Sequence, residues 1–355
     1  MIRANRKDLN SLVAVLRRFR CDLKKYRPMK KGQLIFFIAC CFLLGSCQQV
    51  VKHKTLKLAH GLDPTHPVHK AMLIMGEEME KESGGKLKLE IYPSGQLGSE
   101  QQCVELLQLG SLAITKVSAA VMEGFTDNYQ VFGLPYMFRS KEHAFKVLDG
   151  KIGDELLTSS EKFNLRGLCF YDAGARSFYT LGRNIKSPDD LKGLKIRVMK
   201  SQTAMNMVKA MGGAPTPISW GELYTALQSG VVDGAENNPP SFYTSRHYEV
   251  CKYFALNEHT RVPDLLVIST VVWNKLSEEE KGWLQAAAKK SVVAQRKLWA
   301  DSEEESLKKV IAEGVEVIYP VKEPFAEKVQ DLLDSYQEQP DLYKLIQRIQ
   351  ATSVD

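Results

Sequence analysis

The clearest indication of the fold is the stretch Leu191–Phe242, which reads LKGLKIRVMKSQTAMNMVKAMGGAPTPISWGELYTALQSGVVDGAENNPPSF. A short apolar run with an arginine in it, LKIRVM, is followed by a helical pattern that ends at two glycines, and then the alternation repeats. The second helix begins at the capping box Ser219-x-x-Glu222 and ends before Gly230. This strand–helix order predicts an α/β fold with mostly parallel sheets.

The same alternation continues on both sides of that stretch. Upstream, TLKLAHG, KLKLEIYP, LAITKVSAAV and LRGLCFYDAG are predicted strands separated by helical segments, and downstream KYFALNEHTRVPDLLVISTVVW holds two more strands. The segment Ser277–Gly314 contains no proline and starts with the capping box Ser277-x-x-Glu280. One helix of that length is on the order of 50 Å long, so we expect it to cross from one domain to another.

The N-terminal region has the pattern of an export signal. Residues 1–28 are basic and read as an extension ahead of the true start at Met29. A basic pair and an apolar run too short to span a bilayer then lead to Leu44-Gly45-Ser46-Cys47, so residues 29–46 are a predicted lipoprotein signal peptide. We expect cleavage before Cys47 and a lipid on its thiol, which would hold the protein at a membrane in the periplasm or outer envelope. The alternative is a short amphipathic anchor that stays attached.

The charge balance follows from this assignment. Residues 1–46 hold 11 Lys or Arg and 2 Asp or Glu, and the whole chain carries +6, so residues 47–355 carry −3. The basic excess belongs to the targeting region and gives no support for a nucleic-acid partner. Of seven Cys, three follow Cys47, and their wide spacing fits buried thiols rather than disulfides or a metal site.

No local motif indicates catalysis. The chain has no GxSxG, HExxH or GxxxxGK[ST] pattern, so neither an enzyme class nor a cofactor is indicated. His60, His66 and His69 are close in sequence, but a strand end, a proline-containing loop and a helix start separate them. We expect them to point in different directions rather than bind zinc, with His66 lining a cleft.

Several polar and aromatic residues are candidates for ligand contacts. Arg197 lies inside an apolar strand and Arg176 follows another, and each is either a half-exposed partner of a surface acid or part of a clamp on an anionic ligand. Trp220 is either a core residue or a flat platform for a sugar ring. Lys116 and Ser118 lie near a strand end, where open α/β sheets bind ligands. The segment containing Glu236, Asn237 and Asn238, stiffened by two prolines, is either a turn or a rigid set of hydrogen-bonding groups.

Taken in order, the motifs IYPSGQLGSEQQCVELLQLGSL, VFGLPYMF, the block Leu191–Phe242 and HYEV resemble the DctP-type solute-binding proteins of TRAP transporters. The resemblance runs from about Leu56 to the C-terminus. It implies a two-lobed periplasmic-binding-protein-like fold with a ligand cleft between the lobes and the long helix spanning both. Residues 54–173 and 263–302 would form lobe I, and residues 174–262 and 303–355 would form lobe II.

The resemblance also implies a site and partners. Arg197 matches the family arginine that pairs with the ligand carboxylate, Arg176 a second one, Asn237 the family amide, and Trp220 the aromatic. Where the family usually has ENP this chain has ENNPP, so Asn238 would contact the ligand together with Asn237. The residues MKSQ after the IRV strand would bring Lys200 or Gln202 near the site.

The segments LDPTHPVHKAM and ENNPPSFYTSRHYEV resemble members that bind hexuronates such as glucuronate or galacturonate. Glu236, Lys116, Ser118 and His66 would then contact hydroxyls, and TRAP membrane permease subunits would be the partner. Other acidic ligands (diketogulonate, sialic acid, a C4-dicarboxylate or a keto acid), a periplasmic enzyme on acidic sugars and a sensor partner remain the alternatives.

Overall fold

The protein is described by a computed structural model of residues 53–354. The predictions for residues 1–28, residues 29–46 and Cys47 lie outside the described residues. Within residues 53–354, no helix has the length and apolar character that a membrane span requires.

The first sheet, sheet A, has five strands in the order β2-β1-β3-β10-β4. β1 pairs in parallel with β2 and β3, whereas β10 lies antiparallel between β3 and β4. Every residue of β3 and β10 is buried, as expected for central strands covered on both faces. The strands are β1 (Lys54–Ala59), β2 (Leu87–Tyr92), β3 (Ile114–Ser118), β4 (Leu165–Tyr171) and β10 (Asp264–Ser269).

The second sheet, sheet B, has six strands in the order β11-β9-β5-β8-β6-β7. β6 is parallel to β7 and β8, and β5 lies antiparallel between β8 and β9. We call the parts of the protein built around sheets A and B the sheet A half and the sheet B half. The strands of sheet B are β5 (Arg176–Thr180), β6 (Lys195–Val198), β7 (Ala214–Pro217), β8 (Gly234–Asn237), β9 (Tyr253–Thr260) and β11 (Glu316–Ile318).

The prediction of mostly parallel sheets was only partly right. Among the described strands, five pairings are parallel and four are antiparallel. One reason is that the chain passes between the sheets in two extended crossings, from β4 to β5 and from β9 to β10. These two crossings run side by side in opposite directions, so they add the antiparallel pairs β4–β10 and β5–β9.

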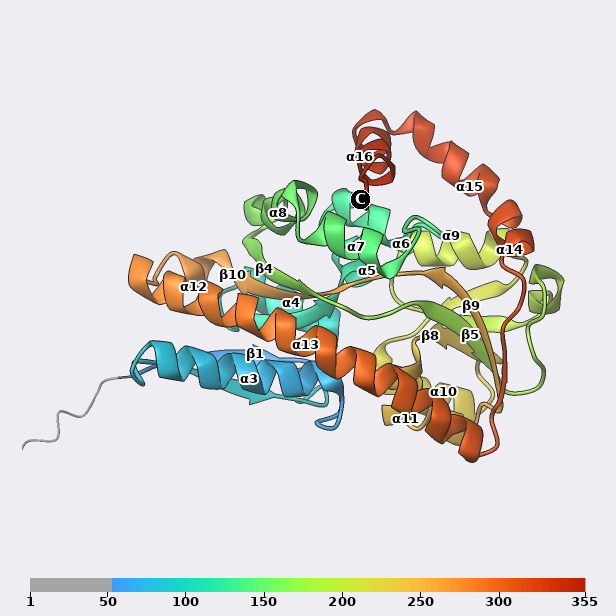
Figure 1. Ribbon diagram of the computed structural model, residues 1–355, viewed down its shortest axis with the longest axis horizontal. Helices are drawn as coiled ribbons and strands as arrows, with labels where there is room; N and C mark the ends of the chain where they lie inside the picture. Colours follow the sequence, from blue (N-terminus) through green and yellow to red (C-terminus); the bar gives the residue numbers. More distant parts are fainter. Residues whose placement is uncertain (1–52, 355) are drawn as a thin grey trace, which may run out of the picture. The chain divides into compact units, whose positions relative to one another are not determined.

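Helices cover both sheets (Figure 1). The α-helices are α3 (Pro67–Glu82), α4 (Glu100–Gln108), α5 (Ala119–Met122), α6 (Gln130–Gly133), α7 (Lys141–Leu148), α8 (Lys151–Thr158), α9 (Gln202–Ala210), α10 (Trp220–Gln228), α11 (Pro239–Thr244), α12 (Thr270–Trp273), α13 (Glu278–Ala312), α14 (Glu323–Lys328), α15 (Gln330–Ser335) and α16 (Pro340–Gln350). Short 3-10 turns are η2 (Asp127–Tyr129), η3 (Glu161–Phe163), η4 (Pro188–Leu191), η5 (His247–Glu249) and η6 (Tyr336–Glu338).

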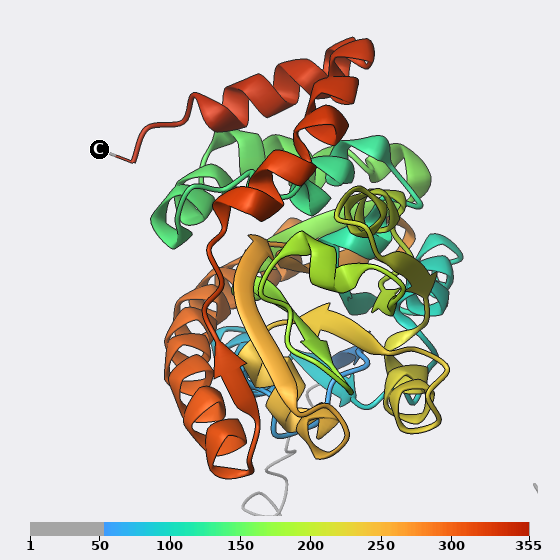
Figure 2. The ribbon, with the colours of Figure 1, turned by 90° about the vertical axis from the view of Figure 1, so that its right-hand side faces the viewer.

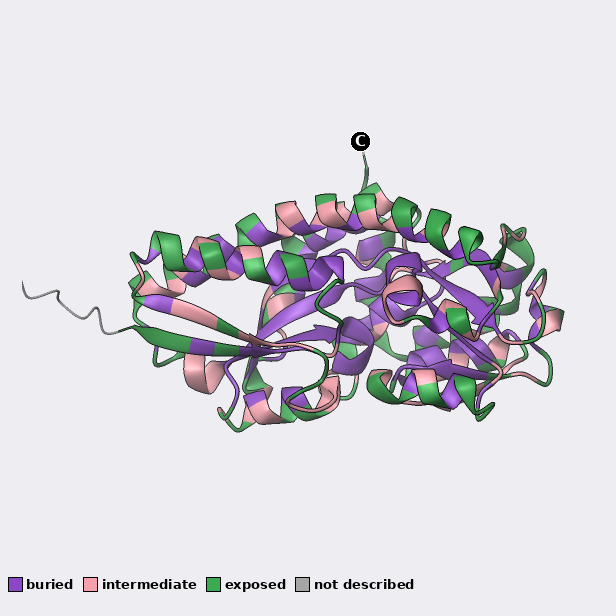
Figure 3. Ribbon diagram, turned by 90° about the horizontal axis from the view of Figure 1, so that it is seen from below, coloured by how far each residue is buried: buried purple, intermediate pink, exposed green. Residues whose placement is uncertain are grey.

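The predicted long helix is α13, and it packs on both halves. Its capping box is formed, since Ser277 Oγ accepts from the Glu280 N–H and the Glu280 side chain accepts from the Ser277 N–H. In Figure 1 α13 runs from α12 and β10 at one end to α10 and α11 at the other, and it packs against α3, β4 and α11. Buried residues recur at the three- and four-residue steps of one helix face, and the outer face is exposed (Figure 3).

The first crossing segment is attached to the middle of α13. The Asp172 N–H donates to Gln295 Oε1 at 2.9 Å, and Gln295 Nε2 donates to the Asp172 carbonyl at 2.7 Å. Gly174 has a φ of +60°, and a Cβ there would lie 2.9 Å from Glu303 Oε1 and 3.0 Å from Trp299 Nε1. Glycine is therefore required where the chain passes from sheet A to sheet B against this helix.

The C-terminal helices differ from the predicted domain boundary. Residues 303–355 were expected to belong to lobe II, but α16 packs into the hydrophobic core of the sheet A half. Its side chains Leu345 and Ile346 share a cluster with Val147 and Leu148, and Figure 2 shows the red C-terminal helices lying over the green helices of that half. The apolar positions of α16 recur at helical spacing, but their spacing does not reveal which half they cover.

Candidate functional site

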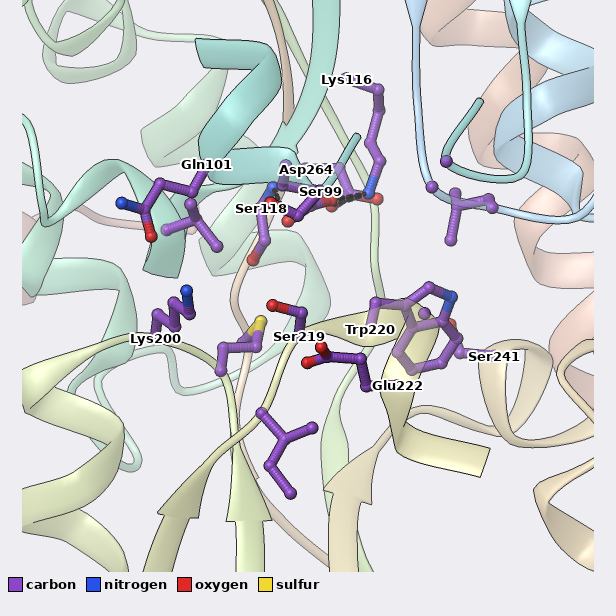
Figure 4. A pocket seen from close by; sticks show the side chains of 18 of the residues that line it. Ser99, Gln101, Lys116, Ser118, Lys200, Ser219, Trp220, Glu222, Ser241 and Asp264 are labelled. Carbon is purple, nitrogen blue, oxygen red and sulfur yellow. Dashed lines mark hydrogen bonds and ion pairs between the residues drawn. The ribbon is translucent and has the colours of Figure 1, made fainter. Parts of the chain in front are cut away.

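A cavity of about 720 Å³ is lined by residues from both halves. Figure 4 shows Lys116, Ser118 and Asp264 on one side and Ser219, Trp220 and Glu222 on the opposite side. A cavity of this size is within the range of small-molecule binding sites. Of the ten predicted ligand-binding residues, seven line it: Lys116, Ser118, Arg176, Arg197, Trp220, Asn237 and Asn238.

Arg197 is a buried cation with no ion-pair partner among residues 53–354. It lies on β6, its side chain enters the cavity wall, and the residue is 2 % exposed. Its Nε donates to the Ile218 carbonyl at 2.8 Å, but Nη1 has no hydrogen-bond partner in the described part of the chain. Burial lowers the pKa of Arg197, although a guanidinium stays protonated. A buried charge of this kind is costly unless an anion pairs with it.

Arg176, in contrast, is already paired. Its Nε donates to Glu236 Oε2 at 2.5 Å, its Nη2 to Glu236 Oε1 at 2.8 Å, and its Nη1 to Asn237 Oδ1 at 2.8 Å. Burial opposes the charge on Glu236, but Arg176 and His259 outweigh burial and lower the pKa of Glu236 to about 2. The pair is therefore ionised and neutral overall, so Arg176 adds no unpaired positive charge to the cavity wall that it lines.

Glu236 itself is not a cavity residue, contrary to the prediction. It is 1 % exposed and lies beneath Arg176, where it serves as the counter-ion. Asn237 Oδ1 accepts from Arg176 Nη1, from the Asn238 N–H at 2.9 Å and from Asn238 Nδ2 at 3.0 Å. Because its oxygen is saturated in this way, the Nδ2 group of Asn237 is the part of that amide available to a ligand.

The segment with the double proline is neither a simple turn nor a free set of hydrogen-bonding groups, because it forms the start of a helix. Asn238 is the N-cap of α11, because its Oδ1 accepts from the Ser241 N–H at 2.8 Å, and Pro239 and Pro240 occupy the first helical turn. Proline is favoured there since those N–H groups have no helical partner. Asn238 Nδ2 also donates to the Ala173 carbonyl at 3.0 Å. Both ends of the Asn238 amide are therefore used within the protein.

Trp220 lines the cavity at the start of α10. The guanidinium carbon of Arg197 lies 5.8 Å from the centroid of its ring, and the ring of His247 lies 5.2 Å away on a tilted plane. The indole thus packs beside the guanidinium of Arg197 and leaves an aromatic surface in the cavity wall. A ring with apolar C–H groups can stack on such a surface.

The sheet A half contributes a charged cluster. Lys116 Nζ lies 2.6 Å from Glu100 Oε1 and 3.2 Å from Asp264 Oδ1, and all three residues line the cavity. Burial disfavours the charged amine, but Asp264 and Glu100 outweigh burial and raise the pKa of Lys116. The two carboxylates were missed from the sequence. Glu100 is the first residue of α4, and Asp264 directly follows a proline at the start of the apolar strand β10, so neither stands out in the sequence.

One of the predicted residues, Gln202, lies outside the cavity wall. Gln202 is the first residue of α9 and points to solvent, where its Nε2 donates to Asn206 Oδ1 at 2.8 Å. Lys200, the other candidate for this position, lines the cavity. The cap at Ser201 explains the difference, because the helix begins after it and turns Gln202 outward.

The histidines also differ from expectation. His66 is 1 % exposed and lies behind the cavity wall, with Nε2 3.3 Å from Ser241 Oγ, while Ser241 itself lines the cavity. His60 and His69 do not point apart, because His60 Nε2 lies 2.9 Å from His69 Nδ1. Burial is the main cause that lowers the pKa of His60 to about 3. Among the described residues, no group of His, Cys, Asp and Glu side chains is arranged to hold a metal ion.

Comparison with known proteins agrees with this architecture. The model of the family described as bacterial extracellular solute-binding protein, family 7, matches residues 58–339. An uncharacterized protein YiiZ of Salmonella typhimurium is 40 % identical over 297 residues, which cover 83 % of this chain and 90 % of that protein. The chain therefore belongs to this family of solute receptors, and the resemblance to DctP-type proteins is confirmed.

Solved structures give the same result. A TRAP periplasmic solute-binding protein of Xanthobacter autotrophicus, solved with bound β-D-galacturonate, is 41 % identical with a TM-score of 0.81, and the match covers 84 % of this chain and 100 % of that one. A second such protein, from Chromohalobacter salexigens and solved with bound D-glucuronate, is 32 % identical with a TM-score of 0.81. That match covers 83 % of this chain and 99 % of the other. The predicted two-lobed α/β fold with a long helix is confirmed.

Proposed function

We propose that this protein is the extracytoplasmic receptor of a TRAP transporter and that its ligand is a hexuronate, which it delivers to a membrane permease. The observation that carries the proposal is Arg197, a buried guanidinium with an unpartnered Nη1 at the wall of the cavity. A carboxylate is the planar partner that matches a guanidinium with charge-assisted hydrogen bonds. Similar proteins solved with galacturonate and glucuronate support the choice of ligand.

The rest of the cavity suits the body of a sugar acid. The Nδ2 group of Asn237 is a free donor, and the ring of Trp220 offers a stacking face. Lys116, Ser118 and Ser241 add polar groups for hydroxyls. Buried hydroxyls must be paired for tight binding, so a cavity with many polar groups is expected of a sugar receptor.

Binding should close the two halves around the ligand. Arg197, Asn237 and Trp220 belong to the sheet B half, whereas Lys116 and Ser118 belong to the sheet A half, so one ligand bridges both. The crossings at residues 172–175 and 261–263 would serve as the hinge. The two moving bodies would be residues 54–173 with 263–302 and α16, and residues 174–262 with 303–339. The closed form would then dock on the permease.

The proposal is for a receptor and not an enzyme. A glycosidase-type reaction requires two carboxylates with separate acid and base roles. Glu100 and Asp264 both line the cavity, but Lys116 lies between them as a common partner. We therefore expect a bound uronate to be recovered chemically unchanged after prolonged incubation with the protein, as measured by NMR.

A thermal-shift screen tests the ligand class. A ligand at about 100 times its Kd stabilises the native state by about 2.7 kcal/mol, which raises the melting temperature by several degrees. We expect such a shift with glucuronate or galacturonate and none with glucose, because glucose lacks the carboxylate. A shift only with keto acids or sialic acid would keep the receptor and discard the uronate.

The lipid anchor is a separate part of the proposal. Cys47 follows a basic and apolar segment and the small residues Gly45 and Ser46, which is the pattern of a lipoprotein signal. We expect the Cys47→Ser variant to appear in the soluble fraction of cells that retain the wild-type protein on membranes, since a single substitution removes the acylated thiol. Continued membrane attachment of the variant would contradict lipidation at this residue.

A further inference from the structure

The Lys116 cluster, formed by Lys116, Glu100 and Asp264, has more negative than positive charge. One ammonium group lies between two carboxylates, so the cluster carries a net charge of −1 when all three are ionised. The side chains of Lys116, Asp264 and Glu100 are 4 %, 11 % and 17 % exposed. A buried ion pair that serves only stability is normally balanced, because an excess charge away from water is costly.

The excess charge faces the cavity. Glu100 Oε1 accepts from Lys116, and its Oε2 accepts from the Ser118 N–H at 3.3 Å. Asp264 Oδ1 also accepts from Lys116, but its Oδ2 has no hydrogen-bond partner within residues 53–354. Burial raises the pKa of Asp264 against the opposing effect of Lys116. The wall therefore has acceptor capacity that the protein itself does not fill.

Positive and negative charges lie on opposite sides of the cavity. Arg197 lies in the sheet B half and the Lys116 cluster in the sheet A half. In Figure 4 Lys116 and Asp264 lie across the cavity from Trp220, the residue that packs beside Arg197. The Arg197 guanidinium thus lies on one side of the cavity without an anionic partner, and the other side has an excess of negative charge.

We infer that Glu100 and Asp264 select for ligands with a single carboxylate by accepting hydroxyls at the end opposite Arg197 and repelling a second carboxylate there. This inference rests on the proposed function, and it names the feature that separates sugar monoacids from dicarboxylates. A hydroxyl donates to a carboxylate in a charge-assisted bond. A second carboxylate in the same place has no proton to donate and meets a like charge.

Galacturonate and galactarate provide the test, because galactarate carries a carboxylate in place of the aldehyde carbon of galacturonate. Calorimetric Kd values are measured for both with the full chain in mild detergent. For the wild-type protein we expect galacturonate to bind at least tenfold more tightly than galactarate. In Asp264→Asn and in Glu100→Gln, each of which removes one negative charge from the cluster, we expect this ratio to shrink by at least tenfold.

The control is Asp189→Asn, which removes the same charge from an exposed side chain paired with Lys192 and should leave the ratio unchanged. If either variant weakens both ligands equally, the carboxylates have a structural role only and the inference is wrong. Tight binding of galactarate by the wild-type protein also overturns it. If neither galacturonate nor glucuronate binds the wild-type protein, the proposed function fails and the inference fails with it. If galacturonate binds but the affinity ratio stays the same in the variants, only the inference fails.

Discussion

The Arg197→Ala variant is expected to lose its uronate binding while keeping its fold. Removing one partner of a buried charge pair costs about 3–5 kcal/mol, which corresponds to a roughly 10²- to 10⁴-fold weaker affinity. Within residues 53–354 this side chain makes one hydrogen bond, from Nε to the Ile218 carbonyl. Because the guanidinium is unpaired without ligand, its removal relieves a buried charge and should leave the melting temperature within a few degrees of wild type.

Calorimetric titration with glucuronate and galacturonate measures the effect, and unfolding of the ligand-free variant checks the fold. Arg183→Ala is the matched control, because Arg183 also lies in the sheet B half but is exposed and donates to the Lys192 carbonyl. We expect this control to bind like the wild-type protein. Normal binding by Arg197→Ala would remove the carboxylate clamp from the proposed function.

Local signals in the sequence were sufficient for most of the secondary structure. The capping box at Ser277 and the absence of proline before Gly314 predict α13 to within two residues of its observed bounds, Glu278–Ala312. The strand direction was not predictable in the same way. Antiparallel pairs arise because residues 172–175 and 261–263 carry the chain between sheets, and no local pattern marks a strand that continues into another sheet.

The candidate site was also only partly predictable from local sequence signals. Arg197 stood out from the sequence because a charged residue interrupts an apolar strand. Arg176 looked equivalent, yet its role is set by Glu236, which is 60 residues further along the chain and meets it through the pairing of β5 with β8. The charged partners of Lys116 are likewise 16 and 148 residues away. Such pairings depend on tertiary contacts, so a single sequence could not distinguish an arginine without an ion-pair partner from a paired one.

The Glu236→Ala variant is expected to unfold far more readily than the wild-type protein. It leaves Arg176, which is 5 % exposed, as a buried charge without its counter-ion. Breaking such a pair costs about 3–5 kcal/mol of stability. The lowering of the Glu236 pKa from 4.5 to about 2 corresponds to about 3 kcal/mol, in agreement with that range.

The pH dependence of this loss has a defined sign. Since the pKa of Glu236 is depressed in the folded state, its contribution is complete above pH 4.5 and is lost as the pH falls towards about 2. Urea denaturation at pH 7 should therefore show the full difference in unfolding free energy between variant and wild type, and this difference should shrink below pH 4.5.

The control variant is Glu249→Ala, which removes an exposed carboxylate instead of a buried one. Adding Arg176→Met to Glu236→Ala should restore part of the stability, because it removes the uncompensated charge. A Glu236→Ala variant as stable as wild type at pH 7 would contradict the assignment of Glu236 as the stabilising counter-ion of Arg176.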